Sequence, residues 1–228
     1  YFIFPNPRDR QWEKQVSMSI TADNSYIVAY LAKPSTYREV YVTSLQPDGS
    51  MGHDSAYFAD KDEEVSTRTT FTCSNGGTQN DNSRYKRRPS VVGLANGLFV
   101  VVYQSYNLCN NHDTILGRTG PSSSRTLDSE IFEITPYDST LNTACVGCFG
   151  FDEQYSEGYD GGNLKAVDGF SDSSFVVTWM IRKNGADAYD VVFQRFNYDW
   201  SKIDEIRQPV NTHTNGDQLG SQVAVFSD

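Results

Sequence analysis

The chain has 228 residues and a mass of 25.6 kDa, enough for one large β domain or two modest ones. It carries 19 Lys and Arg against 29 Asp and Glu, a formal net charge of −10. This acidity argues against a nucleic-acid partner and against docking on an anionic membrane, since both need a basic patch. No apolar run approaches the roughly 18 residues that cross a bilayer, and an aromatic share of 13% is too high for a disordered acidic tail. The composition therefore predicts a folded, acidic, soluble domain.

Short runs of β-branched and aromatic residues recur along the chain, at residues 26–30 (YIVAY), 99–103 (FVVVY) and 175–179 (FVVTW). Each run follows a cluster of Asp, Asn, Gly or Ser, which is typical of strands joined by tight hairpins. The most helix-like stretch, residues 60–65, is charged and runs directly into the Thr-rich residues 67–72. The sequence therefore predicts an all-β chain.

The three strands belong to a repeat whose anchors are Tyr26, Phe99 and Phe175. An apolar residue stands eight positions before each anchor, and Asp or Asn stands three positions before it. The apolar residues are Met18, Val91 and Val167, and the turn residues are Asp23, Asn96 and Asp172. A fourth copy begins near the end of the sequence, with Val223, Phe226 and Asp228.

A second pattern follows each anchor, in which alternating apolar residues precede an Asp-bearing turn. It covers residues 40–49, residues 191–199 and, with one additional residue, residues 131–138. Another apolar strand is expected after each turn, near residues 56–58, 141–146 and 203–210. Four successive strands form the blade of a propeller, so we expect a β-propeller-like fold of four-stranded antiparallel blades. A β-sandwich with similar hairpins is the alternative.

The repeat divides the chain into five segments. Three are expected to be complete blades, the first segment the end of a preceding blade and the last the start of another. Their bounds are residues 1–14, 15–88, 89–163, 164–217 and 218–228. The sequence opens on Tyr1 with no leader pattern and stops inside an expected strand, so we expect it to be an excerpt of a longer protein.

Long insertions are expected on one face of the blades, because all of them join strands 2 and 3 or strands 4 and 1. They cover residues 60–88, 104–129 and 147–163. Loops of this kind on a rigid β scaffold usually carry recognition.

The last segment of the chain resembles a repeat of secreted bacterial adhesins and haemolysin-type calcium-binding proteins. Its pattern is V-N-x-x-T-x-G-D-Q followed by V-A-x-L-x-D, and residues 209–228 (PVNTHTNGDQLGSQVAVFSD) match it at Val210, Asn211, Thr214, Gly216, Asp217, Gln218, Val223, Ala224 and Asp228. Residues 89–103 and 175–179 match its second half, which ends in F-V-V-x-W. The resemblance implies tandem propeller-like modules on a secreted or cell-surface protein. It assigns no catalytic residue.

Four cysteines lie in or beside the expected insertions: Cys73, Cys109, Cys145 and Cys148. An even number outside the strands, together with repeats of a secreted type, favours disulfides in an oxidising compartment. Of the three connectivities we favour Cys73–Cys109 and Cys145–Cys148. A redox C-x-x-C, a zinc site and free thiols are the alternatives, although no helix signal or second close pair accompanies Cys145 and Cys148.

Calcium is the metal that the sequence favours most, although weakly. Hard oxygen ligands occur at Asp160, Asp168 and Asp217, but no EF-hand or β-roll motif contains them. Aspartates at turns mostly accept hydrogen bonds from the backbone instead. The three histidines, His53, His112 and His213, stand in polar contexts, and no nucleophile-elbow motif is present, which leaves only a spatially assembled triad open.

A glycan-binding surface is the strongest alternative reading. Propellers that bind or cleave sugars use exposed aromatic and carboxylate side chains on one face, and the candidates here are Tyr106, Tyr155, Glu157 and Tyr159. A sialidase-type blade motif is missing, and no carboxylate pair for glycoside hydrolysis stands out among the 29 acidic residues.

Together these patterns predict a non-enzymatic, extracellular structural or adhesive module of a large surface or filament-forming protein. Because open sheet edges can pair with another chain, we expect self-assembly or contact with other surface proteins. No cofactor other than calcium is expected. A glycan-binding or glycan-cleaving propeller is the alternative function.

Overall fold

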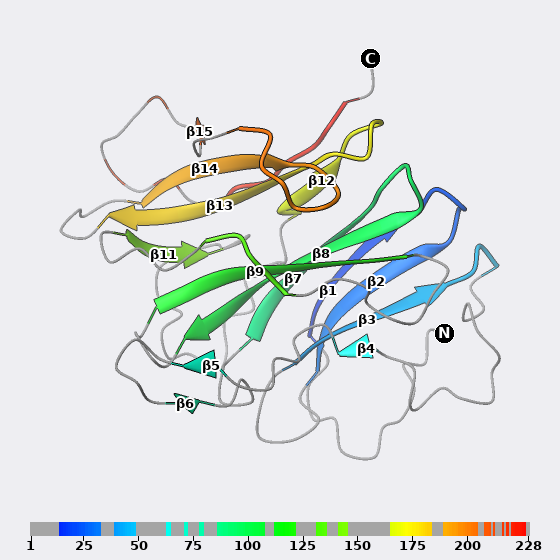
Figure 1. The fold of residues 1–228 in the computed structure, drawn as a ribbon, viewed down its shortest axis with the longest axis horizontal. Helices are drawn as coiled ribbons and strands as arrows, with labels where there is room; N and C mark the ends of the chain where they lie inside the picture. Colours follow the sequence, from blue (N-terminus) through cyan, green and yellow to red (C-terminus); the bar gives the residue numbers. More distant parts are fainter. Residues whose placement is uncertain are drawn as a thin grey trace.

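The computed structural model describes the following residues: 14–32, 39–48, 63–64, 71–72, 78–79, 86–107, 112–121, 131–135, 141–145, 165–183, 189–204, 208–210, 212, 216, 218 and 220–226. Every regular element within these ranges is a β-strand, which confirms the predicted all-β class (Figure 1). No helix in the described part of the chain is long and apolar enough to span a membrane.

The strands, in chain order, are β1 (Lys14–Ile20), β2 (Tyr26–Ala32), β3 (Glu39–Leu45), β4 (Glu63–Glu64), β5 (Phe71–Thr72), β6 (Thr78–Gln79), β7 (Lys86–Gly93), β8 (Leu98–Asn107), β9 (His112–Pro121), β10 (Phe132–Glu133), β11 (Leu141–Cys145), β12 (Val167–Gly169), β13 (Phe175–Lys183), β14 (Tyr189–Phe196) and β15 (Gln208–Pro209).

Most of these strands form three antiparallel sheets. Sheet 1 has the order β1-β2-β3-β4, sheet 2 the order β7-β8-β9-β10, and sheet 3 the order β11-β13-β14-β15, with β12 also paired to β13. Strands β5 and β6 form a separate ribbon. Four-stranded antiparallel units in chain order, as the repeat predicted, are therefore present in sheets 1 and 2.

The second strand of each sheet is the one that the repeat anchored, and it pairs with the first strand in a shared register. Met18 lies opposite Val28 in sheet 1, Val91 opposite Val101 in sheet 2, and Val167 opposite Val177 in sheet 3. The apolar residue eight positions before each anchor thus occupies the same site in all three hairpins.

Three of the hairpin turns, and the turn after β14, have one geometry. They begin at Thr21, Leu94, Phe170 and Asn197. In each, the first residue donates its N–H to the carbonyl four positions on (2.7–2.9 Å) and accepts from the N–H three positions on (2.9–3.2 Å). The fourth residue has a positive φ, between 63° and 81°. This is a three-residue hairpin loop with a left-handed residue at its end.

The Asp or Asn of the repeat explains why these turns form. Its side-chain oxygen accepts a hydrogen bond from the N–H two positions on, at 3.1 Å for Asp23 and Asn96 and at 2.9 Å for Asp172 and Asp199. The side chain therefore closes the loop locally, as Asx turns do. Asp199 is the turn residue of the third unit's second pattern, and its turn matches the other three.

The third strand of sheet 2 differs from the prediction. We expected residues 131–138 to form it and residues 104–129 to be an insertion, but β9 lies within that insertion and pairs with β8 from Leu98↔Pro121 to Asn107↔His112. Residues 132–133 form only a short fourth strand. The prediction was wrong because β9 is rich in Gly, Thr and charged residues and lacks the alternating apolar pattern.

The strand at residues 141–145 also differs. It was expected to end the middle unit, but β11 pairs with β13 of sheet 3, with Cys145 opposite Met180. Strand β12 pairs with the other half of β13. The first strand of sheet 3 is thus divided in two at the site where β1 and β7 carry a register shift, between Lys14 and Ser17 and between Arg87 and Ser90.

The three sheets pack face to face, with sheet 2 in the middle. One core cluster joins sheets 1 and 2 through Ile27, Ala29, Phe99 and Val101, and another joins sheets 2 and 3 through Val100, Val102, Phe175 and Val177 among others. Strand β8 is therefore buried on both faces. This explains why residues 99–103 are apolar throughout and do not alternate with polar residues.

An aromatic group closes the second core. Trp200, in the turn after β14, is 5% exposed and stacks on Phe132 of sheet 2 with ring centroids 5.0 Å apart. It meets Phe175 and Phe196 edge to face at 4.9 and 6.0 Å. Its indole lies against Gly117, where a Cβ would collide with the ring. Trp200 also has a φ of 67°, unusual for a large side chain, which indicates that the packing holds it there.

Candidate functional site

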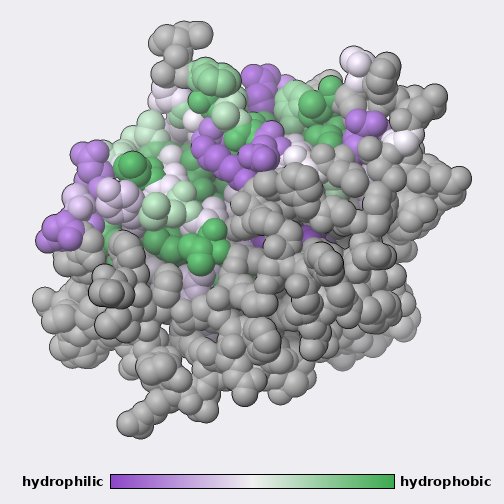
Figure 2. All heavy atoms as spheres, turned by 180° about the vertical axis from the view of Figure 1, so that it is seen from behind, coloured by the Kyte–Doolittle hydropathy of each residue, from purple (hydrophilic) through white to green (hydrophobic). Residues whose placement is uncertain are grey.

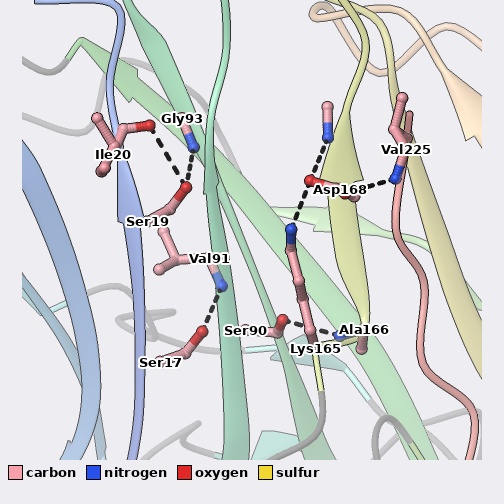
Figure 3. Close-up of polar contacts among 11 residues, drawn as sticks. Ser17, Ser19, Ile20, Ser90, Val91, Gly93, Lys165, Ala166, Asp168 and Val225 are labelled. Carbon is pink, nitrogen blue, oxygen red and sulfur yellow. Dashed lines mark hydrogen bonds and ion pairs between the residues drawn. The ribbon is translucent and has the colours of Figure 1, made fainter. Parts of the chain in front are cut away.

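The first strands of successive sheets lie side by side, and a set of hydrogen bonds connects them. We call this set the inner-strand ladder: side-chain oxygens of Ser17, Ser19, Ser90 and Asp168 accept from backbone N–H groups of the next unit, in β7, directly before β12, or in the segment 221–226. Figure 3 shows β1, β7, β12 and the segment 221–226 in this order, from one side of the view to the other. The ladder recurs from one junction to the next among the described residues, and it is our candidate functional site.

Two bonds of the ladder join sheets 1 and 2. The hydroxyl oxygen of Ser17 accepts from the N–H of Val91, and that of Ser19 accepts from the N–H of Gly93, both at 3.1 Å (Figure 3). Alternation along β1 directs both serines to the same face. The two serines therefore accept hydrogen bonds from N–H groups at the edge of β7 that do not pair with another strand. Backbone N–H groups at a buried edge require such acceptors.

The next bond joins sheets 2 and 3. Ser90 is fully buried, and its hydroxyl oxygen accepts from the N–H of Ala166 at 3.0 Å. Ser90 and Ser17 each stand directly before the apolar residue that lies eight positions ahead of the anchor. The same position in the repeat thus supplies a serine acceptor at both junctions.

The last bonds attach the segment 221–226 to sheet 3. Asp168 Oδ2 accepts from the N–H of Val225 at 2.7 Å (Figure 3). The carbonyl of Lys165 accepts from the N–H of Val223 at 3.0 Å. Aligned on the anchors, Asp168 holds the position of Ser19. Val223 was predicted to begin a fourth copy. The segment lies against β12 as β7 lies against β1, with N–H groups donated to the preceding strand.

The charge of Asp168 is balanced locally. Lys165 Nζ lies 2.7 Å from Asp168 Oδ1, and the side chains are 47% and 13% exposed respectively. Oδ1 therefore contacts the Lys165 ammonium and accepts from the N–H of Gly169 at 3.1 Å, and Oδ2 accepts from Val225. Because its acceptor is charged, the hydrogen bond from the Val225 N–H to Asp168 is expected to be stronger than the corresponding bonds to serine hydroxyls.

Close approach of the first strands requires a small residue at one point. A Cβ on Gly93 would collide with the carbonyl oxygen of Ile20 and lie 2.8 Å from the Cα of Thr21. Both obstacles are backbone atoms, so they cannot move aside without separating β1 from β7. At the corresponding junction of sheets 2 and 3, Gly169 has a side-chain neighbour, Leu94, at 3.0 Å.

The two ends of the ladder expose apolar side chains. Val16, Met18 and Ile20 alternate along β1 and are 47%, 61% and 58% exposed, whereas Val91 and Val167 at the position of Met18 are 1% and 0% exposed. At the other end Phe226 is 87% exposed. Viewed from behind, the described surface shows hydrophobic residues among hydrophilic ones (Figure 2).

A buried arginine lies at the register shift of β7. Arg88 is 3% exposed, has a φ of 57°, and donates from Nη1 to the side-chain oxygen of Gln104 at 3.2 Å. Gln104 is itself 2% exposed. In sheet 2 the pair lies beside the register shift of β7, at the position equivalent to the one where the first strand of sheet 3 is divided.

The turns at the rim of the sheets hold carboxylates with lowered pKa values. Hydrogen bonds from the Ser201 hydroxyl and N–H lower the pKa of Asp199, and those from Ser174 do the same for Asp172. The Thr21 hydroxyl, followed by the Ser25 N–H, lowers the pKa of Asp23. Each donor favours the charged form of the acid. These aspartates therefore serve the turns.

An ion pair connects β14 to the segment that follows its turn. Arg195 donates to Asp204 through Nε at 3.0 Å and Nη2 at 2.8 Å, a bidentate arrangement. It lowers the pKa of Asp204 and raises that of Arg195, chiefly through the hydrogen bonds. Because Arg195 is 44% exposed, the pair contributes little to stability.

Most of the residues singled out from the sequence lie outside the described part of the chain. These are Cys73, Cys109, Cys148, Tyr155, Glu157, Tyr159, Asp160 and Asp217. For Tyr106, in β8, and Cys145, in β11, the structure describes the backbone alone. Asp168 is described, and its oxygens contact Lys165 and Val225. Among the described residues no three His, Cys, Asp or Glu side chains gather in a group that would hold a metal ion.

The serines of the ladder were not recognised from the sequence, and Asp168 was considered only as a possible calcium ligand. Ser17, Ser19 and Ser90 are common residues on expected strands, and a serine there is usually a solvent-facing one. The available signal was their position, next to the apolar residue that each repeat buries. This position indicates a hydrogen bond to a backbone N–H only once the neighbouring strand is known.

No protein-family model matches the chain, and neither does any curated protein.

Proposed function

We propose that this chain is a non-enzymatic structural module in which four-stranded units follow one another in propeller-like order. The inner-strand ladder is the observation that carries the proposal. It recurs at three junctions, joining β1 to β7, β7 to β12, and β12 to the segment 221–226. First strands that face one another in sequence order are what propeller blades place around their axis.

The polar groups of this site support a scaffold role. Ser17, Ser19 and Ser90 accept from backbone N–H groups, and Asp168 does so while contacting Lys165. The oxygens thus satisfy buried edges, and the turn aspartates close hairpins. Such contacts stabilise an assembly of sheets and need no substrate.

In keeping with the resemblance of residues 209–228 to repeats of surface adhesins, we propose that the module acts outside the cell as part of an adhesive or filament-forming protein. The disulfides Cys73–Cys109 and Cys145–Cys148 belong to this proposal. Peptide mapping under non-reducing conditions tests them, since free thiols or another connectivity would contradict the pairing.

A glycan assay tests the function itself. The chain and its Tyr106→Ala, Tyr155→Ala and Glu157→Ala variants are applied to a glycan array and incubated with fluorogenic glycosides, with Tyr198→Ala as a control at an exposed turn. We expect no turnover and equal array signals for all proteins. Hydrolysis lost on substitution would overturn the proposal. Specific binding without hydrolysis, lost in the same variants, would show a glycan-binding module instead.

A further inference from the structure

The exposed face of β1 corresponds to a face that is buried elsewhere in the molecule. Met18 lies opposite Val28, and Ile20 opposite Tyr26, so both side chains are on the face of sheet 1 directed away from sheet 2. At the same position Val91 packs on sheet 1 and Val167 packs on sheet 2. In both cases the preceding sheet covers the residue.

The segment 221–226 has the complementary exposed face. The N–H groups of Val223 and Val225 donate to Lys165 and Asp168 of the third unit, and the two valine side chains are partly buried. The alternate residues, Gln222, Ala224 and Phe226, are exposed. With Val223 and Asp228 aligned on Val167 and Asp172, they hold the positions of Ser90, Val92 and Leu94, which are 0%, 4% and 1% exposed beneath the following unit.

From these two faces we propose that β1 of one copy docks on the segment 221–226 of a second copy, head to tail. The contact continues the interface between first strands that already recurs within the chain, and it would bury Met18 against the neighbour as Val91 and Val167 are buried. This proposal rests on the proposed structural role and identifies the partner as a second copy of the chain. The contact joins two different surfaces and is therefore heterologous, so its repetition gives a ring or a filament.

Among the described residues, strands β1, β7, β12 and the segment 221–226 follow one another in a row, and the two faces are at its opposite ends (Figure 3). A second copy presents both faces, so one head-to-tail contact would complete the two at once. In the register of the ladder, Gln222 holds the position of Ser17, so its side-chain carbonyl would accept from the N–H of Met18.

Two substitutions test the contact. Met18→Asp changes β1, the head of the proposed contact, and Phe226→Asp changes the segment 221–226, its tail. Each places a charge where the interface is apolar. Sedimentation velocity over a range of concentrations should show oligomers for the wild-type chain. In either variant the apparent Kd should rise by at least about tenfold. Tyr198→Asp, at an aromatic residue in a turn that is 52% exposed, should leave association unchanged.

Mixing the two variants distinguishes this geometry from others. A Met18→Asp chain keeps an intact tail and a Phe226→Asp chain keeps an intact head, so an equimolar mixture should form a one-to-one dimer and nothing larger. A mixture that stays monomeric, or a single variant that assembles like the wild type with an unchanged circular dichroism spectrum, would contradict the contact. So would a wild-type chain that is monomeric at every concentration. That result leaves the structural role standing, because the glycan assays test it separately.

Discussion

Asp168 accepts a hydrogen bond from the backbone N–H of Val225 at 2.7 Å, across 57 residues of sequence. Ser19 accepts from Gly93 in the same way across 74 residues. Aligned on their anchors, Ser19 and Asp168 hold one position of the repeat. Two different side chains thus make the same junction, and the feature common to both is an acceptor oxygen directed at the next first strand.

Removing the acceptor at Asp168 should release the terminal segment. We expect Asp168→Ala to lower the free energy of unfolding by about 1.5 kcal/mol, because a charge-assisted hydrogen bond and an ion pair are lost together. Hydrogen exchange at the Val225 amide should accelerate more than exchange in β8. Asp168→Asn is the matched control, since its side-chain oxygen still accepts from Val225. Equal exchange in both variants would show that the acceptor does not hold the segment.

The contact between β1 and β7 should not tolerate a methyl group. We expect Gly93→Ala to destabilise the protein by about 1–3 kcal/mol, since its Cβ meets the backbone of Ile20 and Thr21. Gly97→Ala is the comparison: it has a φ of 81° and nothing within 4 Å of the added Cβ, so only a conformational cost of about 1 kcal/mol is expected. Chemical denaturation measures both. A smaller effect at position 93 than at 97 would contradict the close approach.

Trp200 and Gly117 should show coupled effects. Gly117→Ala alone makes the added methyl group collide with ring atoms of Trp200, and we expect the free energy of unfolding to fall by about 1–3 kcal/mol. In a Trp200→Gly background, which itself loses aromatic packing, the same substitution should cost less. A double-mutant cycle of unfolding free energies measures the coupling. Additive effects would mean that the two residues do not meet.

The turn aspartates should make stability depend on acid pH. The pKa values of Asp23, Asp172 and Asp199 are lower in the folded chain, so their contribution is full above the unfolded value of about 3.9 and is lost as the pH falls through the lowered values. Thermal melts should therefore show a Tm that decreases as the pH falls below about 4.

Asparagine at these three positions provides the control for the acid effect. Asn96 already accepts from the N–H of Leu98 in an equivalent turn without a charge. The triple Asp→Asn variant should keep its turns, and its Tm should decline less steeply with acid than that of the wild type. An unchanged slope would assign the acid sensitivity to other groups.

Sequence patterns predicted the hairpins well because their causes are local. The Asp or Asn three positions before an anchor closes the turn by bonding a backbone N–H two residues away, and no distant residue takes part. The apolar run at residues 99–103 likewise predicted a strand. The sequence did not show that both faces of this strand are buried, because the burial comes from the packing of sheets 1 and 3 on either side.

Strand partners were harder to predict. Strand β9 lacks alternating apolar residues, and its place beside β8 comes from a hairpin that runs from residue 98 to residue 121. Strand β11 follows sheet 2 in the chain and yet pairs with β13 of sheet 3. Backbone pairing is insensitive to side-chain identity, so a polar strand can take either neighbour.

Taken by itself, then, the sequence determined the all-β class, the anchors of three hairpins and the turns that join them, because each depends on residues a few positions apart. Only the tertiary structure decided which strands share a sheet and which serines and aspartates connect one unit to the next. A side-chain oxygen acquires that role from the N–H group that packing brings to it, here from residues more than fifty positions away in the chain.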